Sequence, residues 1–255
     1  MFSSGADQMQ SGMKGGISSA GAIPLQPRGG PPACALFREL LPDGVSIAEK
    51  LEEGDPARLM AGERQLVEHV APKRAREFSA GRVCARAALA EFGIVNVPVG
   101  ALGDRRPQWP PGLTGSITHT DGFSAAAVGE RLKFRAIGID AERIGRISGD
   151  LLSHLLLPAE LAWLESLPAS EQPKVATLMF GAKEAFYKCQ YEVTEQWLEF
   201  KDVALALAGG TLDRGSFAVR PVRHARLFER DGCAAVVHFA VAGELVLSAM
   251  VITAH

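Results

Sequence analysis

The sequence of 255 residues has little cysteine and no excess of positive charge. Its four cysteines, Cys34, Cys84, Cys189 and Cys233, form no CxxC pair and no Cys/His cluster, which argues against a zinc site and a dense disulfide framework. Lys and Arg number 27 against 29 Asp and Glu, so the net charge of -2 creates no field that would attract nucleic acid or an anionic membrane. We therefore expect no nucleic-acid partner, and any phosphate binding must be local.

Long apolar runs and several common catalytic motifs are also missing. No stretch reaches the ~18 apolar residues that span a bilayer, and the start lacks the basic segment and apolar run of a secretory signal. We therefore expect a cytoplasmic protein with no membrane partner. The absence of GxxxxGK[ST], GxGxxG after a strand, GxSxG and HExxH removes the main support for an ATPase, a dinucleotide oxidoreductase, a serine hydrolase or a zincin.

The composition divides the chain into a predicted tail and a globular part. Residues 1–33 are rich in Gly, Ser and Pro and have little to bury, which predicts a flexible tail. Across the whole chain, 47% of the residues are hydrophobic and 22% are charged, which is typical of globular proteins. The remaining length suffices for one large domain or two small ones.

Hydrophobic spacing in the globular part predicts a long helix followed by antiparallel strands, twice. We expect an α+β fold of two similar halves, residues 34–138 and 139–255, each with an antiparallel sheet and one long helix, related by a pseudo-twofold axis. The long helices are predicted at 75–92 and 172–191, and shorter helical segments at 55–70 and at 150–167 with a break at Pro158. Strands are predicted at 36–41, 116–119, 123–128, 134–140, 200–207, 216–222, 234–241 and 245–252, with hairpins through 129–130 and 242–244.

Two carboxylates end the apolar run AIGIDAE. Asp140 and Glu142 are two residues apart, so on an extended chain both leave the same face. Two anions held this close repel unless a cation lies between them, and Mg²⁺ with its preference for oxygen ligands would resolve the repulsion. A polar strand end entering a loop explains the pair as well, so the residues alone leave both interpretations open.

The segment FGAKEAFYK adds a third carboxylate. Glu184 and Lys188 lie one helical turn apart, which an exposed ion pair explains by itself. If Glu184 lay near the other two carboxylates it would complete a Mg²⁺ site. Lys183 and Lys188 could then neutralise the oxygens of a bound pyrophosphate.

Two further segments carry groups suited to phosphate. His119 lies in GSITHTDGF beside the hydroxyls of Ser116, Thr118 and Thr120, although a histidine next to a strand often has only a structural role. Arg82 and Arg86 are four residues apart on the first long helix, with Arg74 just before it, and a solvated basic face explains this pattern equally well.

The segments GSITH, GIDAE and FGAKEAFYK, in this order, resemble the 4′-phosphopantetheinyl transferase superfamily. The resemblance extends from about Leu36 to the end, includes REFSAGRVCARAAL and RPQWPPGLTG, and is closest to the Sfp-like, pseudodimeric branch of the enterobactin synthetase component D type. It implies transfer of phosphopantetheine from coenzyme A to a serine of an acyl or peptidyl carrier protein, with release of adenosine 3′,5′-bisphosphate. The nucleophile then comes from the partner, and the coenzyme A cleft lies between the halves.

The resemblance also implies roles for individual residues. The Mg²⁺ ligands would be Asp140, Glu142 and Glu184. The residues that contact coenzyme A would be Arg74, Arg82, Arg105, Arg106, Thr118, His119, Lys183 and Lys188. Glu184, Lys188 and His119 would form the catalytic group, and either Glu184 or a metal-bound water would accept the proton.

Several alternatives stay open. The same carboxylates could serve a Mg²⁺-dependent nucleotide pyrophosphatase or phosphodiesterase, or the chain could be a non-catalytic module that binds coenzyme A or a carrier protein. The carrier could belong to siderophore, other nonribosomal peptide, polyketide or fatty-acid synthesis, and we expect it to dock around residues 191–207. Because one chain supplies both sides of the site, we expect a monomer.

Overall fold

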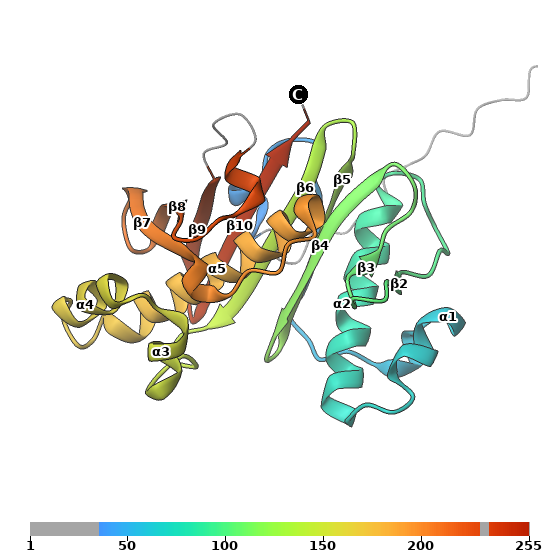
Figure 1. Ribbon diagram of the computed structural model, residues 1–255. Helices are drawn as coiled ribbons and strands as arrows, with labels where there is room; N and C mark the ends of the chain where they lie inside the picture. The colour runs from blue at the N-terminus through green and yellow to red at the C-terminus, as the bar shows by residue number, and fades with distance from the viewer. Residues whose placement is uncertain (1–35, 230–234, 255) are drawn as a thin grey trace, which may run out of the picture. The chain divides into compact units, whose positions relative to one another are not determined.

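The computed structural model describes residues 36–229 and 235–254 (Figure 1). The predicted tail at 1–33, together with Cys34 and Cys233, lies outside the described residues. Residues 33–255 form one compact unit, and the division into halves at 138 and 139 stays a prediction. In the part of the chain that is described, no helix is both long and apolar enough to cross a membrane.

The first long helix, α2 (Pro72–Ala90), packs on a three-stranded antiparallel sheet. Pro72 begins the helix, where its missing N–H costs no hydrogen bond. Ala85 and Leu89 on its inner face pack against Ala126 and Val128 of the sheet. The strand order is β1 (Ser46–Lys50), β5 (Phe123–Glu130) and β4 (Leu113–Thr120).

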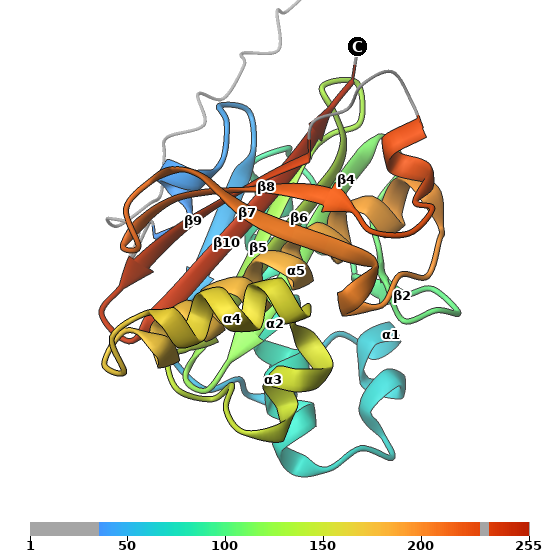
Figure 2. The same cartoon turned by 60° about the vertical axis from the view of Figure 1, so that its left-hand side comes forward.

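The second long helix, α5 (Gln172–Thr194), lies along a five-stranded antiparallel sheet, as Figures 1 and 2 show. Gly138 allows the close approach, because a Cβ there would lie 2.0 Å from the carbonyl oxygen of Ala185. Both predicted long helices and the antiparallel α+β class are thus confirmed. The strand order is β6 (Phe134–Arg143), β10 (Leu245–Thr253), β9 (Ala235–Ala242), β8 (Arg214–Pro221) and β7 (Val203–Gly210).

The predicted hairpin through residues 129–130 is wrong. Strand β5 already has both edges occupied, by β1 and β4, so β6 pairs instead with β10 of the other sheet. Hydroxyl groups join β6 to β4: Ser116 Oγ accepts the N–H of Ile139 at 3.1 Å, and Thr118 Oγ1 accepts the N–H of Ala141 at 3.0 Å. The hairpin through 242–244 is confirmed.

The remaining differences lie in short segments. Residues 36–41, predicted as a strand, contain a 3-10 turn, η1 (Arg38–Leu40), and the helix predicted at 55–70 is broken into η2 (Pro56–Arg58), α1 (Ala61–Arg64) and η3 (Gln65–Val67). The break has a local cause, because the buried Glu63 turns back to accept the N–H groups of Met60 and Val99. The other elements are β2 (Gly100–Ala101), β3 (Pro107–Gln108), α3 (Asp150–Leu155), α4 (Pro158–Ser166), η4 (Phe200–Asp202) and η5 (Arg226–Glu229).

Candidate active site

A cavity of about 480 Å³ is lined by α2, the β2–β3 hairpin, β4, β6 and α5. Strand alternation turns Asp140 and Glu142 of β6 to the same side, and α5 adds side chains at the spacing of one helical turn. The predicted site residues that line the cavity are Arg74, Arg82, Arg105, Arg106, Thr118, His119, Asp140, Glu142, Glu184 and Lys188.

Asp140 is the most constrained carboxylate of the cavity. Its side chain is 5% exposed, and Oδ1 accepts hydrogen bonds from Lys188 Nζ at 2.7 Å and from Thr118 Oγ1 at 3.2 Å. Lys188 Nζ also donates to the carbonyl oxygen of Ile139 at 3.2 Å. The second oxygen, Oδ2, is buried without a hydrogen-bond partner among the described residues. A buried anionic oxygen that lacks a donor is costly, and it marks a place that suits a cation.

The charges around Asp140 are unbalanced. Burial, together with the neighbouring Asp140, raises the pKa of Glu142 to about 7. Burial also raises the pKa of Glu184. Burial alone would lower the pKa of Lys188, but Asp140 and Glu184 raise it above its usual value. Arg146 and Lys188 favour the ionised form of Glu142, but burial and the neighbouring carboxylates outweigh them.

The donor chemistry of this group fits a hard divalent cation. All three carboxylates offer the oxygen ligands that Mg²⁺ prefers, and the unpartnered Oδ2 of Asp140 is the donor most in need of one. Within residues 36–229 and 235–254, no three His, Cys, Asp or Glu side chains are grouped closely enough to hold an ion. The Mg²⁺ site at Asp140, Glu142 and Glu184 therefore stays a prediction.

The opposite side of the cavity carries Arg74 of α2 and His119 of β4. Arg74 Nη1 lies 2.7 Å from His119 Nε2 and 3.6 Å from a carboxylate oxygen of Glu77. Burial lowers the pKa of His119, an effect that Glu77 opposes and Arg74 reinforces. A neutral imidazole can accept a hydrogen bond from the guanidinium at Nε2, so the contact keeps Arg74 at the cavity wall.

Arg82 has a larger structural role than the sequence predicts. It is 5% exposed, Nε donates to the carbonyl of Val99 at 2.7 Å, and Nη2 donates to that of Gly100 at 3.0 Å. The guanidinium carbon lies 4.1 Å from the ring centroid of Phe78, and burial lowers the pKa of Arg82 to about 10. Two of its nitrogens thus hold the start of β2, although the residue still lines the cavity.

Lys183 does not reach the cavity, which corrects its predicted phosphate contact. Its side chain is 1% exposed, and Nζ donates to Glu160 at 2.7 Å and to the carbonyls of Leu155 and Phe200. The reason is helical geometry: Lys183 and Lys188 are five residues apart and so point about 140° apart around α5. The lysine that faces the cavity is Lys188.

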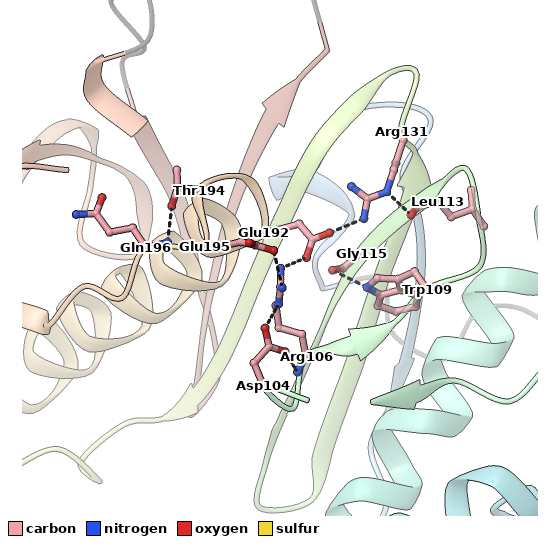
Figure 3. Close-up of polar contacts among 10 residues, drawn as sticks. All are labelled: Asp104, Arg106, Trp109, Leu113, Gly115, Arg131, Glu192, Thr194, Glu195 and Gln196. Atoms are coloured by element: carbon pink, nitrogen blue, oxygen red, sulfur yellow. Dashed lines mark hydrogen bonds and ion pairs between the residues drawn. The ribbon is translucent and has the colours of Figure 1, made fainter. Parts of the chain in front are cut away.

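Glu192 is a cavity residue that the sequence analysis missed (Figure 3). Glu184, Lys188 and Glu192 follow one another at intervals of four residues, so this stripe of charged residues along one face of α5 was a usable signal. The carboxylate of Glu192 binds Arg106 of the hairpin and Arg131 of the β5–β6 connection. Arg106 is therefore engaged in ion pairs within the protein.

Two families of known sequences match this chain. Residues 62–129 match the 4′-phosphopantetheinyl transferase N-terminal domain, and residues 136–237 match the 4′-phosphopantetheinyl transferase superfamily. The 4′-phosphopantetheinyl transferase Npt of Nocardia iowensis is 37% identical over 183 residues, which cover 71% of this chain and 82% of that protein. The chain belongs to the 4′-phosphopantetheinyl transferase superfamily. It is thus a transferase, and the predicted resemblance is confirmed.

Other known proteins are similar to parts of this chain. The transferase Svp of Streptomyces mobaraensis is 40% identical over 171 residues, which make up 65% of this chain and 67% of Svp. Enterobactin synthase component D of Escherichia coli K12 is 38% identical over 125 residues, which make up 48% of this chain and 57% of that protein. The structure of the Thermotoga maritima holo-[acyl-carrier-protein] synthase aligns with 45% of this chain and 61% of that chain, at 17% identity and a TM-score of 0.34.

Proposed function

We propose that this transferase moves phosphopantetheine from coenzyme A to a serine of an acyl or peptidyl carrier protein, with Mg²⁺, and releases adenosine 3′,5′-bisphosphate. The observation that carries the proposal is the unpartnered Oδ2 of Asp140, in a cavity that has three carboxylates on one side and the Arg74–His119 pair on the other. Such a cavity suits a ligand whose phosphates must be held by a metal ion and by cations together.

The residues of the cavity divide the work between holding phosphate and moving a proton. Mg²⁺ bound by Asp140, Glu142 and Glu184 would neutralise charge on the pyrophosphate and polarise it for attack. Lys188, which already bonds to Asp140, would add a cation next to the leaving phosphate. Of the protein groups, Glu184 is the candidate acceptor for the serine proton, because its carboxylate lines the cavity.

The carrier protein would approach along an apolar groove that adjoins the cavity. Glu184 and Tyr187 line both hollows, so the groove leads to the proposed proton acceptor. Trp197 forms its rim: the ring is 73% exposed and packs edge-on against Tyr187, with ring centroids 5.5 Å apart. An exposed tryptophan of this kind is typical of protein interfaces. Because one chain supplies all the walls of the cavity, we also propose that the enzyme acts as a monomer.

Intact mass spectrometry tests the proposal. A panel of apo carrier proteins from siderophore, other nonribosomal peptide, polyketide and fatty-acid synthesis would be incubated with the enzyme, coenzyme A and Mg²⁺. We expect at least one carrier to gain the mass of one phosphopantetheine, and its Ser→Ala variant to gain nothing. Cleavage of coenzyme A without a carrier would show a pyrophosphatase or phosphodiesterase instead. Binding of coenzyme A or carrier with neither reaction would show a non-catalytic module.

A further inference from the structure

A bridge of ion pairs connects the β2–β3 hairpin to the C-terminal end of α5 (Figure 3). The guanidinium of Arg106 donates to three carboxylates: Nε to Asp104 at 2.7 Å, Nη1 to Glu192 at 3.1 Å and Nη2 to Glu195 at 3.3 Å. Its carbon also lies 4.9 Å from the ring centroid of Tyr191. Each of the three guanidinium nitrogens therefore has an acidic partner, so a phosphate would compete with these carboxylates for Arg106.

Glu192 is the centre of the bridge. Its side chain is 13% exposed, whereas that of Glu195 is 73% exposed. The second oxygen of Glu192 accepts a hydrogen bond from Arg131, whose Nε donates to the carbonyl of Leu113 at the start of β4, at 2.9 Å. One carboxylate thus ties together the hairpin, β4 and α5. Charge-assisted pairs that are largely shielded from water hold geometry better than exposed pairs do.

Arg105, the next residue along the hairpin, is in the opposite situation. The turn is closed by hydrogen bonds from the N–H of Leu102 to the carbonyl of Arg106 and from the N–H of Arg105 to the carbonyl of Leu102. Arg105 adopts a left-handed backbone conformation with φ of 73° and lines the cavity. Among the described residues, no hydrogen bond or ion pair engages its guanidinium. Arg105 is therefore available to a ligand.

We propose that Glu192 is a positioning residue, which holds Arg106 so that the hairpin presents Arg105 to an anionic group of the ligand in the cavity. The inference rests on the proposed function, with coenzyme A as the anionic ligand. It assigns different roles to two adjacent arginines: Arg106 anchors the hairpin, and Arg105 binds. A neutral residue at position 192 would remove the partner that Arg106 and Arg131 share, and it would leave Arg106 only the exposed Glu195 as its link to α5.

The first test compares Glu192→Gln with Glu195→Gln, which removes the same charge from the exposed partner of Arg106. Calorimetric titration of the full-length protein with coenzyme A should show a Kd about 10-fold higher for Glu192→Gln, the scale of one lost charge-assisted hydrogen bond. We expect a change below about 2-fold for Glu195→Gln, because exposed pairs contribute little. The kcat of Glu192→Gln at saturating coenzyme A should stay within about 2-fold of wild type, since the residue acts on binding. Equal Kd values for Glu192→Gln and wild type would overturn the proposal.

A double-mutant cycle separates positioning from direct binding. If Glu192 acts through Arg105, then Glu192→Gln should change the Kd by less than about 2-fold in an Arg105→Ala background. Independent effects, about 10-fold from Glu192→Gln in both backgrounds, would show that Glu192 does not act through Arg105. Should Glu192→Gln fail to fold, Arg106→Gln breaks the same bridge from the hairpin side and takes its place in both tests.

Hydrogen exchange without ligand tests the bridge independently of any transfer activity. Amides of residues 100–108 should exchange faster in Glu192→Gln than in wild type or Glu195→Gln, while amides of α2 stay unchanged. Unchanged exchange in the hairpin would overturn the positioning role. If the wild-type protein modified no carrier, the proposed function would fail, yet this measurement would still report on the bridge.

Discussion

The two long helices place their cations in parallel ways. On α2, Arg82 is buried and holds neighbouring backbone, while Arg74 lies at the cavity wall. On α5, Lys183 is buried and holds neighbouring backbone, while Lys188 faces the cavity. In each of these two pairs, one cation stabilises the fold and the other lies at the cavity. Residue type does not tell the structural cation from the cavity cation. The position of each residue around the helix axis does.

The helices differ in the acids that accompany these cations. Lys183 has a buried carboxylate partner, whereas the nitrogens of Arg82 bond to carbonyl groups. The α5 side of the cavity also carries the carboxylate group centred on Asp140, and the α2 side carries Arg74 with His119. The α5 side thus carries three carboxylates around Lys188, whereas the α2 side carries Arg74 and His119 together with the single carboxylate of Glu77. An asymmetric ligand, with a metal-bound phosphate at one end and a free phosphate at the other, would have a single preferred orientation.

The largest expected effect is on stability, from Lys183→Met. Removal of the lysine leaves Glu160 as a buried charge without its partner, which costs about 3–5 kcal/mol of folding free energy. Denaturant unfolding measures the change. The double variant Lys183→Met/Glu160→Gln should recover part of the loss, because no buried charge remains. A single variant as stable as wild type would mean that Lys183 is not part of the scaffold.

The next effect is on catalysis, from Asp140→Asn. The substitution keeps the shape of the side chain but removes the charge beside Lys188 and the proposed metal, so carrier modification should slow by at least ~100-fold with little loss of stability. Steady-state kinetics and a thermal melt measure the two changes. Glu244→Gln, at an exposed acid that does not line the cavity, serves as the control. Near-normal turnover of Asp140→Asn would remove Asp140 from the site.

A smaller effect sharpens the comparison between Arg74 and Arg82. If Arg74 binds the 3′-phosphate of coenzyme A, Arg74→Ala should lower kcat/KM for coenzyme A by roughly 10-fold. It should leave the use of dephospho-coenzyme A, which lacks that phosphate, unaffected. Arg82→Ala should lower kcat/KM for both donors, because Val99 and Gly100 lose their hydrogen bonds. The two variants measured with the two donors give the comparison. If Arg82→Ala lowered kcat/KM for coenzyme A but not for dephospho-coenzyme A, Arg82 would be reassigned as the phosphate ligand.

The smallest effect concerns a thiol on the buried face of α2. Burial raises the pKa of Cys84 to about 12, so the reactive thiolate is scarce at pH 8. We expect iodoacetamide to leave Cys84 unmodified in the native protein and to modify it in denaturant, as peptide mapping would show. Rapid modification of the native protein would mean that α2 opens away from its sheet.

Local sequence patterns predicted many of the helices and strands. They could not predict features that depend on contacts between distant parts of the chain. Strand alternation placed Asp140 and Glu142 together, and the period of the helix could have separated Lys183 from Lys188. The partner of β6 depended on which sheet edges were free, which no local pattern records. The ion pair of Arg106 with Glu192 could not be predicted either, because the two residues lie 86 positions apart in the chain.

The left-handed backbone of Arg105 shows a compromise between stability and activity. A glycine would adopt a φ of 73° without the steric cost that a side chain carries there. Selection for thermal stability alone would therefore favour Arg105→Gly, and the cavity would lose a cation that no other residue within 36–229 and 235–254 engages. An engineer who wants a more robust transferase should leave this position unchanged and seek stability elsewhere in the fold.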